Sequence, residues 1–563
     1  MSTTSERLIS CVPNFSEGRD QDVIDAITDR IEAVDGVKLL DVDPGYATNR
    51  TVVTFVGTPE AVIDAAVIAG AKAAELIDMA AHSGEHPRFG AMDVCPLVPV
   101  SGVTMDEAAA YARTLAARLG DEVGLTVYCY ENAATCPERR NLADVREGEY
   151  EGLAARLADP AWEPDFGPKV FNARSGATAV GARGFLVAYN INLNTTSTRR
   201  ANAIAYDVRE RGRVKRTGDP VTGEIVLDDN GDKVWTPGSL KGVKAIGWYI
   251  EEYGVAQISM NITDIDATPV HVAFDEVCDR ASDRGIRVTG SELVGLMPLQ
   301  AVLDAGRYFL RKQKRSTGVS DAELIKIAVK SLGLDELGRF DPADKIIEYA
   351  IDDSSDRLVD LTVRRFVEET ASESVAPGGG SVAANLGALG AALGTMVANL
   401  SSHKRGWDDR WEEFSDWADR GKTCHDEFLT LIDRDTDAFN DIMAALGMPG
   451  GDDAENKARD EALQAATRQA IDVPMRVMEV SLASMEVIHA MAEIGNPASV
   501  SDAGVGALCA RSAVMGAYLN VRINVPGLTD GDAASAYLER GRAIQEKAIA
   551  AEAAILAIVD SRI

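Results

Sequence analysis

Apolar and polar residues alternate in short runs through the first half of the chain, and this pattern predicts strands separated by helices. Apolar runs of strand length occur at 37–42, 51–56, 125–130, 185–191 and 257–261. Apolar positions recur at helical spacing between them, at 59–80, 105–119, 198–210 and 270–284. The alternation predicts an α/β (α+β) half made of two sheet-and-helix subdomains. The polar segment 211–240 interrupts the second of these with a hairpin signal at 229–232.

From about residue 321 the strand pattern gives way to helical periodicity, apart from a short apolar segment at 520–525. The helical stretches are 358–370, 380–400, 411–447, 452–495, 504–521 and 532–562. Several exceed 20 residues, which is typical of an antiparallel helical bundle. We therefore predict an all-α C-terminal half fused to the α/β half. The predicted domains are 1–180, 181–330, a linker at 331–356 and a helical domain at 357–563.

Composition and charge narrow the classes of partner. The 563 residues carry a net charge of −31, which argues against binding to nucleic acid or anionic membranes. The N-terminus lacks the basic and apolar regions of a signal peptide, and the Ala-rich stretch 382–400 is typical of a buried, close-packed helix. The seven cysteines are scattered without a CxxC pair, which indicates reduced thiols rather than disulfides or structural zinc. We expect a cytoplasmic protein.

The segment 82–88 concentrates chemistry that the rest of the chain lacks. It holds two of the six histidines, His82 and His86, together with Glu85 and Arg88. Imidazole suits proton transfer near neutral pH, and an arginine can hold an anionic substrate. The spacing of the histidines would also allow metal binding on a helix, but Gly84 and Pro87 in this segment indicate a loop, and no third ligand is evident. Histidines satisfied within a loop are the structural alternative.

Three further segments of the first half each admit a functional and a structural interpretation. Asn14, Ser16 and Glu17 could line a site or cap the following helix. Asn49 and Arg50 stand at the entrance to a strand, where a turn alone does not explain them. The segment 167–176 could cradle an anionic, aromatic ligand or serve as a linker. Its candidate binding residues are Gly167, Pro168, Lys169, Phe171, Arg174, Ser175 and Gly176.

Two features stand out in the helical half. The glycines that precede a long apolar helix bare N–H groups that suit an anion, although a capped hinge explains them equally well. The residues concerned are Gly378, Gly379, Gly380 and Ser381. Further along, Asp433 and Asp437 share one face of a predicted helix and Asp435 lies opposite. A buried aspartate there would be a candidate acid or base, whereas exposed aspartates are ordinarily solvated.

Long motifs, in order along the whole chain, resemble the bifunctional glutamate formiminotransferase–cyclodeaminase family. In the first half they are CVPNFSEG (11–18), TNRTVVTFVG (48–57), HSGEHPRFGAMDVCP (82–96), EYEGLAARL (149–157), GATAVGARGFLVAYNIN (176–192), AIGWYIEEYGVAQISMN (245–261) and GSELVGLMPL (290–299). In the second half they are PGGGSVAA (377–384), LIDRDTDAF (431–439) and SDAGVG…GAYLNVRINV (501–525). The resemblance implies transfer of a formimino group from N-formimino-L-glutamate to N5 of tetrahydrofolate. Cyclisation to 5,10-methenyltetrahydrofolate with release of ammonia would follow.

The resemblance also assigns roles to residues. It implies that His86 is the base of the transfer step and that Asp435 is the catalytic acid of the cyclisation, while His82 and Glu85 would orient or support. It places folate binding at 167–176, and we add Asn49, Arg50 and Arg88 as candidate ligands of the substrate.

The family resemblance further implies polyglutamylated tetrahydrofolate as substrate and carrier, no metal, and a homo-oligomer built from dimers. The alternative is a folate-binding or scaffolding protein of the same fold with idle sites.

Overall fold

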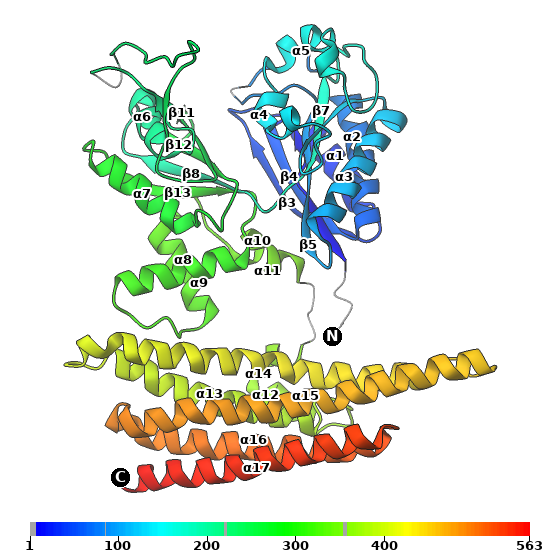
Figure 1. Ribbon diagram of the computed structural model, residues 1–563, viewed down its shortest axis with the longest axis vertical. Helices are drawn as coiled ribbons and strands as arrows, with labels where there is room; N and C mark the ends of the chain where they lie inside the picture. Colours follow the sequence, from blue (N-terminus) through cyan, green and yellow to red (C-terminus); the bar gives the residue numbers. More distant parts are fainter. Residues whose placement is uncertain (1–6, 85, 219–221, 353–356) are drawn as a thin grey trace. The chain divides into compact units, whose positions relative to one another are not determined.

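The structure, a computed structural model, describes residues 7–84, 86–218, 222–352 and 357–563. Its described residues form two compact units. The sheet unit comprises Met1–Ala305 and Ala328–Asp353, and the helical unit comprises Gly306–Ile327 and Ser354–Ile563. The predicted fold class is confirmed, because strands and helices alternate in the first unit and long packed helices make up the second (Figure 1).

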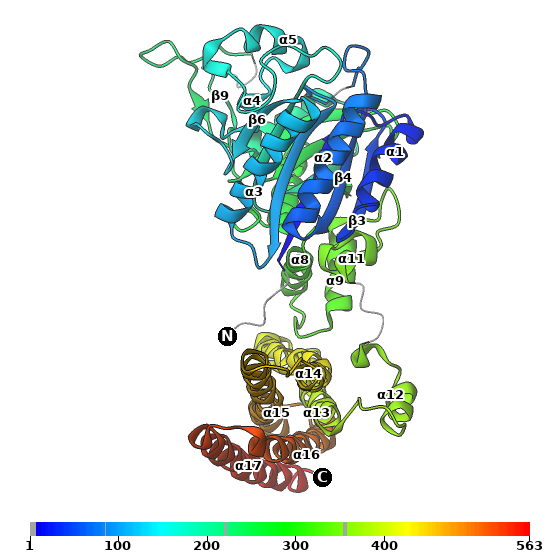
Figure 2. The same ribbon diagram turned by 90° about the vertical axis from the view of Figure 1, so that its right-hand side faces the viewer.

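The first subdomain is built on a seven-stranded mixed sheet with the strand order β1-β4-β2-β5-β7-β6 and β3 added beside β4. The strands are β1 (Leu8–Cys11), β2 (Asn14–Phe15), β3 (Val37–Gly45), β4 (Arg50–Gly57), β5 (Met92–Ser101), β6 (Thr126–Glu131) and β7 (Ala177–Ala182). The helices α1 (Gln21–Glu32), α2 (Pro59–Leu76) and α3 (Met105–Arg118) cover one face (Figure 2). Their apolar stripes share a buried core with the strands, which explains why period-3.6 and strand-length apolar patterns alternate here.

The second subdomain has a four-stranded antiparallel sheet in the order β11-β12-β8-β13. Its strands are β8 (Val187–Leu193), β11 (Val243–Ile250), β12 (Val255–Ile262) and β13 (Val288–Val294), and its helices are α6 (Thr198–Val208) and α7 (Val270–Ser282). One face buries Tyr189 and Ile258. Because side chains alternate across a strand, the other face carries Asn190, Gln257 and Glu292. The carboxylate of Glu292 accepts hydrogen bonds from the amides of Asn190 and Gln257.

The interrupting segment 211–240 forms short pairings rather than a regular strand pair. Strand β9 (Arg213–Val214) pairs with β10 (Trp235–Thr236), and a bridge joins Leu227 to Lys233 around the predicted 229–232 turn. The hairpin signal is therefore confirmed. Residues 219–221 of this segment lie outside the described part of the chain.

The helical unit consists of long helices packed side by side (Figure 1). They are α13 (Gly379–Ser402), α14 (Trp411–Leu446), α15 (Asp453–Ile494), α16 (Val500–Asn524) and α17 (Gly531–Asp560). The short helix α12 (Val363–Thr370) precedes them and has no buried residue. By length and composition α13 could cross a membrane, but 61% of its most apolar window is buried within the unit. The apolar segment at 520–525 is not extended: it ends α16, because Val521 fits the helical period and is fully buried in the core.

Residues 306–327, at the junction of α8 (Leu299–Lys312) and α9 (Asp321–Leu332), belong to the helical unit. Thr317 is fully buried there, and its hydroxyl donates to Asp419 of α14 over 2.6 Å. The ammonium of Lys422 lies 2.8 Å from Asp321. The compact units thus divide the chain differently from the predicted 181–330 domain, because these polar contacts anchor part of that segment to α14.

Candidate active sites

The ring of His82 has a partner on each nitrogen. Its Nε2 lies 2.8 Å from the carbonyl oxygen of Asn49, and its Nδ1 accepts a hydrogen bond from Nε of Arg88 over 3.3 Å. Since a carbonyl can only accept, Nε2 carries the proton. Burial lowers the pKa of His82, which favours this neutral form. These contacts suit an orienting role.

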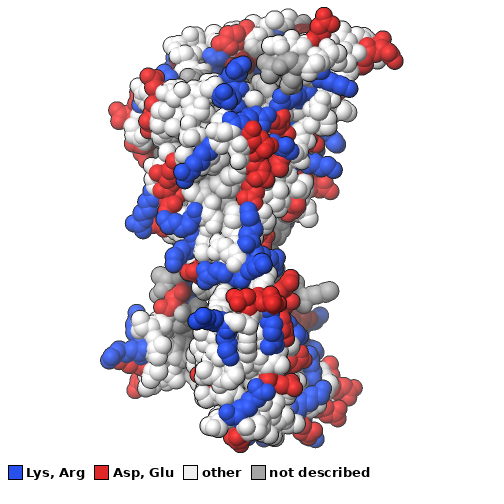
Figure 3. Space-filling model, turned by 90° about the vertical axis from the view of Figure 1, so that its left-hand side faces the viewer, with Lys and Arg blue, Asp and Glu red and all other residues white. Residues whose placement is uncertain are grey.

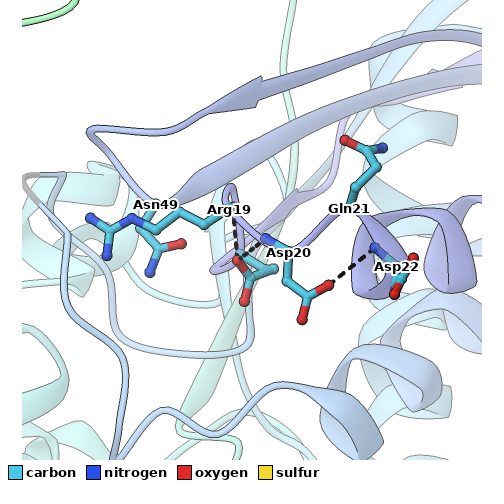
Figure 4. A pocket seen from close by; sticks show the side chains of 6 residues that line it. Arg19, Asp20, Gln21, Asp22 and Asn49 are labelled. Carbon is cyan, nitrogen blue, oxygen red and sulfur yellow. Dashed lines mark hydrogen bonds between the residues drawn. The ribbon is translucent and has the colours of Figure 1, made fainter.

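Asn49 joins three loops at the start of β4. It adopts a left-handed backbone (φ 47°), its Oδ1 accepts from the backbone N–H of Gly18, and its Nδ2 donates to the carbonyl of Ser83. Beside it lies an open pocket of about 510 Å³ (Figure 4), lined by Glu17, Arg19, Asp20, Gln21, Asp22 and Asn49. Glu17 accepts from the backbone N–H groups of Arg19 and Asp20, so its carboxylate fixes the loop before α1, while the side chain of Asp20 caps the helix itself.

His86 presents the geometry of a base. Its Nδ1 donates to the carbonyl oxygen of Pro87 over 2.8 Å, which leaves the lone pair on Nε2. Burial lowers the pKa of His86 to about 3, and the nearby cations Arg50 and Arg146 add to this shift. The neutral ring is therefore the stable form. Glu85, predicted to support it, lies outside the described residues.

An ion cluster that sequence reasoning missed lies beside His86. Asp93 of β5 is fully buried, pairs with Arg50 and lies 3.1 Å from Arg146, while its other oxygen accepts from the N–H of Phe89. Burial alone would raise the pKa of Asp93, but Arg146 and Arg50 together hold it below its usual range. The predicted ligand Arg50 is thus already paired. The sequence did contain one sign of this cluster: Asp93 is the single charged residue in the apolar stretch 92–98, and a buried acid there needs cationic partners.

Arg50 and Arg146 surround the single carboxylate of Asp93, so the His86 site has a net positive charge although the chain as a whole is acidic. Figure 3 shows the same mixture at larger scale, with Lys and Arg side chains interspersed among Asp and Glu on one face. The global charge of −31 therefore coexists with local sites that suit anionic ligands.

Arg88 has its hydrogen-bond partners outside this cluster. Its guanidinium makes two hydrogen bonds to Glu151, at 2.8 and 2.9 Å, and lies over the ring of Tyr150. The ring of Tyr150 contacts Phe171 at 5.5 Å between centroids. Arg88 therefore links the histidine loop to the segment 167–176, and its predicted contact with a substrate carboxylate stays a prediction.

Only the C-terminal end of the candidate folate segment 167–176 lies beside the chain that follows the histidine-containing segment 82–88. Gly176 forms a bridge with Gly90, and a Cβ on Gly176 would lie 2.1 Å from the carbonyl oxygen of Phe89. Ser175 is buried there, and Arg174 donates to the carbonyl of Glu75.

The N-terminal end of the segment 167–176 contacts other residues. Gly167 approaches the Leu125 carbonyl so closely that a Cβ would lie 1.9 Å from it. After Pro168, Lys169 is exposed and pairs with Glu163. The structure thus places Gly176 beside Gly90, which follows the segment 82–88, and leaves Lys169 at the surface.

Asp435 of α14 meets the N-terminus of α13. One carboxylate oxygen accepts from the N–H of Ser381 over 2.8 Å and from its hydroxyl over 3.1 Å. The other faces Gly380, where a Cβ would lie 2.0 Å away. Burial raises the pKa of Asp435, and the two bonds from Ser381 oppose this shift.

The neighbouring aspartates differ from Asp435 in their surroundings. Asp433 accepts from the N–H of Leu358 over 2.7 Å, and Asp437 is exposed. The expected division of faces is therefore observed. The glycines Gly378 and Gly379, which we predicted to bare N–H groups for a substrate anion, adjoin a helix start whose Ser381 N–H is already taken by Asp435.

Comparison with known proteins identifies both halves. Residues 8–183 match the formiminotransferase domain, N-terminal subdomain; 188–352 match the formiminotransferase domain; and 362–543 match the formiminotransferase-cyclodeaminase family. Formimidoyltransferase-cyclodeaminase of Rattus norvegicus is 42% identical over 93% of each chain, and that of Gallus gallus is 41% identical over 99% of each. The chain belongs to the formimidoyltransferase-cyclodeaminase family.

The two halves of this family also have separate relatives. Glutamate formimidoyltransferase of Thermoplasma acidophilum is 40% identical over 54% of this chain and 92% of its own. A crystal structure of formiminotetrahydrofolate cyclodeaminase from Thermotoga maritima, at 25% identity and a TM-score of 0.33, covers 36% of this chain and 97% of its own. A formimidoyltransferase-cyclodeaminase is a transferase and a lyase of histidine and folate metabolism.

Among the described residues, no group of three or more His, Cys, Asp or Glu side chains gathers as metal ligands. All seven cysteines are thiols in the structure, and the sulfur atoms of the buried pair Cys11 and Cys95 lie 3.4 Å apart. A reaction without metal stays a prediction from the family resemblance.

Proposed function

We propose that the two units act in turn on one folate, with His86 as the base of the first step and Asp435 as the acid of the second. The chain has the glutamate formimidoyltransferase and formimidoyltetrahydrofolate cyclodeaminase activities of its family. The observation that carries the residue assignment is that burial shifts both groups towards their neutral forms: it lowers the pKa of His86, whose Nε2 keeps its lone pair, and raises the pKa of Asp435.

In the transfer step, N5 of tetrahydrofolate attacks the formimino carbon of N-formimino-L-glutamate. Nε2 of His86 takes the N5 proton as the tetrahedral adduct forms, because its lone pair is the one left by the Nδ1 bond to Pro87. The bond from carbon to the glutamate nitrogen then breaks, and the same proton passes to that nitrogen. The products are glutamate and 5-formiminotetrahydrofolate.

In the cyclisation, N10 attacks the formimino carbon and closes a five-membered ring. The bond from that carbon to the exocyclic nitrogen then breaks, and the departing nitrogen takes a proton from an acid to leave as ammonia. N10 gives its own proton to the carboxylate so formed, which regenerates the acid. The Asp435 carboxyl, with its raised pKa and the oxygen that faces Gly380, is the proposed donor. The product is 5,10-methenyltetrahydrofolate.

The folate would be polyglutamylated, and the segment 167–176 is the proposed binding site for it. The exposed ammonium of Lys169 and the aromatic contact of Phe171 support this assignment. We propose no metal in either step, since both need only proton transfer and a bound, oriented folate. A location in the cytoplasm agrees with seven reduced thiols.

The test supplies formiminoglutamate and tetrahydrofolate and follows methenyltetrahydrofolate by near-UV absorbance and ammonia separately. His86→Ala should lower transfer by about 10²–10⁴-fold and leave the cyclisation of supplied 5-formiminotetrahydrofolate intact. Asp435→Asn should do the reverse. Because the two assays report on one chain, the unaffected activity is the folding control. Loss of both activities would show that the variant is misfolded, whereas a variant that keeps both activities would refute the assignment.

A homo-oligomer is also proposed, with the outer face of α13 and α16 as its interface. Both helices contact α15 on their inner side, and their outer stripes expose apolar side chains. These are Leu389, Met396 and Leu400 of α13 and Val505, Leu508, Leu519 and Ile523 of α16. Helix α13 has no charged residue, so a second copy of the same uncharged face fits it better than a charged partner. Leu389→Glu should lower the mass measured by light scattering; an unchanged mass would contradict this interface.

A further inference from the structure

We propose that Arg146 is a positioning residue of the transfer site, which fixes the ring of His86 through the carbonyl oxygen of Pro87. Arg146 follows the short helix α4 (Leu142–Val145) and contacts His86 through this shared oxygen. The inference rests on the proposed role of His86 as the base. It adds a residue that neither the motifs nor the comparisons indicate.

The Pro87 oxygen accepts two hydrogen bonds of equal length. Nδ1 of His86 and Nη1 of Arg146 each lie 2.8 Å from it. A carbonyl has two lone pairs and no proton, so the imidazole must place its proton on Nδ1 and its lone pair on Nε2. Arg146 holds the carbonyl in place and thereby selects the tautomer that a base requires.

The side chain of Arg146 is itself held in place by an ion pair with Asp93. Its Nη1 also lies 3.1 Å from a carboxylate oxygen of Asp93, and only 13% of its side chain is exposed. Asp93 is anchored on strand β5 and has Phe89 N–H and Arg50 as further partners. The path from the sheet to the base therefore runs from Asp93 through Arg146 and the Pro87 carbonyl to His86.

The same arrangement sets the charge around the base. Among the described residues, the charged groups with the largest effect on His86 are Arg50 of β4, Arg146 after α4 and Asp93 of β5. With both arginines present the cations exceed the carboxylate by one. Without Arg146, the pair of Arg50 and Asp93 is balanced. An anionic substrate would cancel the excess in the same way, so the base would strengthen when the substrate binds.

Two substitutions separate the charge of Arg146 from its geometry. Arg146→Gln removes the charge but keeps an N–H donor for the Pro87 carbonyl, so the acid limb of transferase kcat/KM should move to higher pH. Arg146→Lys keeps the charge but cannot reproduce the guanidinium geometry, so kcat should fall by about tenfold with the acid limb unmoved. The exposed Arg140→Gln, in the same segment, is the matched control and should change neither.

The tautomer of His86 gives a readout independent of activity. In ¹⁵N-histidine spectra, His86→Ala identifies the His86 signal among the six histidines. We expect the Nδ1–H form in the wild type and a mixture of tautomers in Arg146→Lys. A rise in KM alone, with the acid limb and tautomer unchanged, would overturn the positioning role and make Arg146 a substrate ligand.

Failure of the proposed function has a different signature. If His86→Ala retained full transferase activity, His86 would not be the base, whatever the effect of Arg146. The spectra would still show whether Arg146 fixes the ring.

Discussion

The surroundings of His86 and Asp435 show how one physical effect prepares opposite chemistry. Burial disfavours the charged form of each group, so the pKa of the imidazole falls to about 3 and the pKa of the carboxyl rises. A neutral imidazole can accept a proton, and a neutral carboxyl can donate one. Both sites therefore depend on partial burial rather than on residues with unusual intrinsic properties.

The two sites differ in what accompanies burial. At His86 the positive charges of Arg50 and Arg146 lower the pKa further, in the same direction as burial, so that site depends on charge. At Asp435 the hydrogen bonds from Ser381 oppose it, and a bare Gly380 makes room for the carboxylate, so that site depends on close packing. Charge substitutions should therefore damage the first site most, and added volume should damage the second.

The largest expected effect follows from removing the buried charge of the first site. Asp93→Asn leaves two arginines without their shared carboxylate and should lower the free energy of unfolding of the sheet unit by about 3–5 kcal/mol. Thermal inactivation of the transferase should occur at lower temperature, while cyclodeaminase inactivation should stay unchanged. Asp121→Asn, which removes an exposed charge from the same unit, is the control.

The pH dependence of that effect has a definite sign. The pKa of Asp93 lies below its usual range, so its contribution to stability is complete above the pKa of an unfolded aspartate, about 4. It is lost as the pH falls through the folded value. The stability difference between wild type and Asp93→Asn should therefore shrink below about pH 4. A difference independent of pH would show that lost packing, not charge, causes it.

The sequence indicated the elements of the fold better than the contacts between them. Alternating periods predicted the sheet-and-helix half and the bundle, because amphipathic patterns reflect local geometry. The segment 520–525 departs from the helical prediction in sequence because it is rich in β-branched residues, which are typical of strands. In the structure Val521 is buried in the core as part of α16. The anchoring of residues 306–327 to α14 depends on buried polar contacts such as Thr317 with Asp419, which leave no periodic signal.

The sites show the same limit. The motif resemblance identified His86 and Asp435 as candidates, but Arg146 lies 60 residues from His86 without any local pattern. The glycine-rich helix start at Gly380 suited either a substrate anion or a capped hinge, and in the structure the N–H of the next residue, Ser381, donates to Asp435, 54 residues away in sequence. Local sequence can show that an N–H needs a partner, but the fold decides which partner it receives.

The next largest effect tests close packing at the second site. In Gly380→Ala the new Cβ would lie 2.0 Å from Oδ1 of Asp435, so the carboxyl must move. Displacement of a catalytic group by about 1 Å can cost about 100-fold, and we expect a loss of this size in cyclodeaminase kcat alone. Gly378→Ala is the matched control, because its Cβ meets only the Val375 carbonyl at 3.8 Å. Equal losses in both variants would point to the helix start in general.

A smaller effect tests the bonds that oppose burial at Asp435. Ser381→Ala removes the hydroxyl donor but keeps the N–H bond, so the pKa of Asp435 should rise further. Since the acid acts in its protonated form, the alkaline limb of the cyclodeaminase pH profile should move to higher pH. Its kcat should fall less than about tenfold. Ser381→Thr should restore the wild-type limb, and an unmoved limb in Ser381→Ala would separate Asp435 from that titration.

The smallest expected effect concerns whether both sites share one anchor for the folate tail. Lys169 is exposed and paired with Glu163, so Lys169→Met should change the free energy of unfolding by no more than about 1 kcal/mol. If the segment 167–176 holds the tail, KM for polyglutamylated folate should rise, with kcat unchanged and the monoglutamate unaffected. A tail held there during both steps would raise KM in both assays together. A rise confined to the transferase would mean that the folate is released and bound again at the Asp435 site.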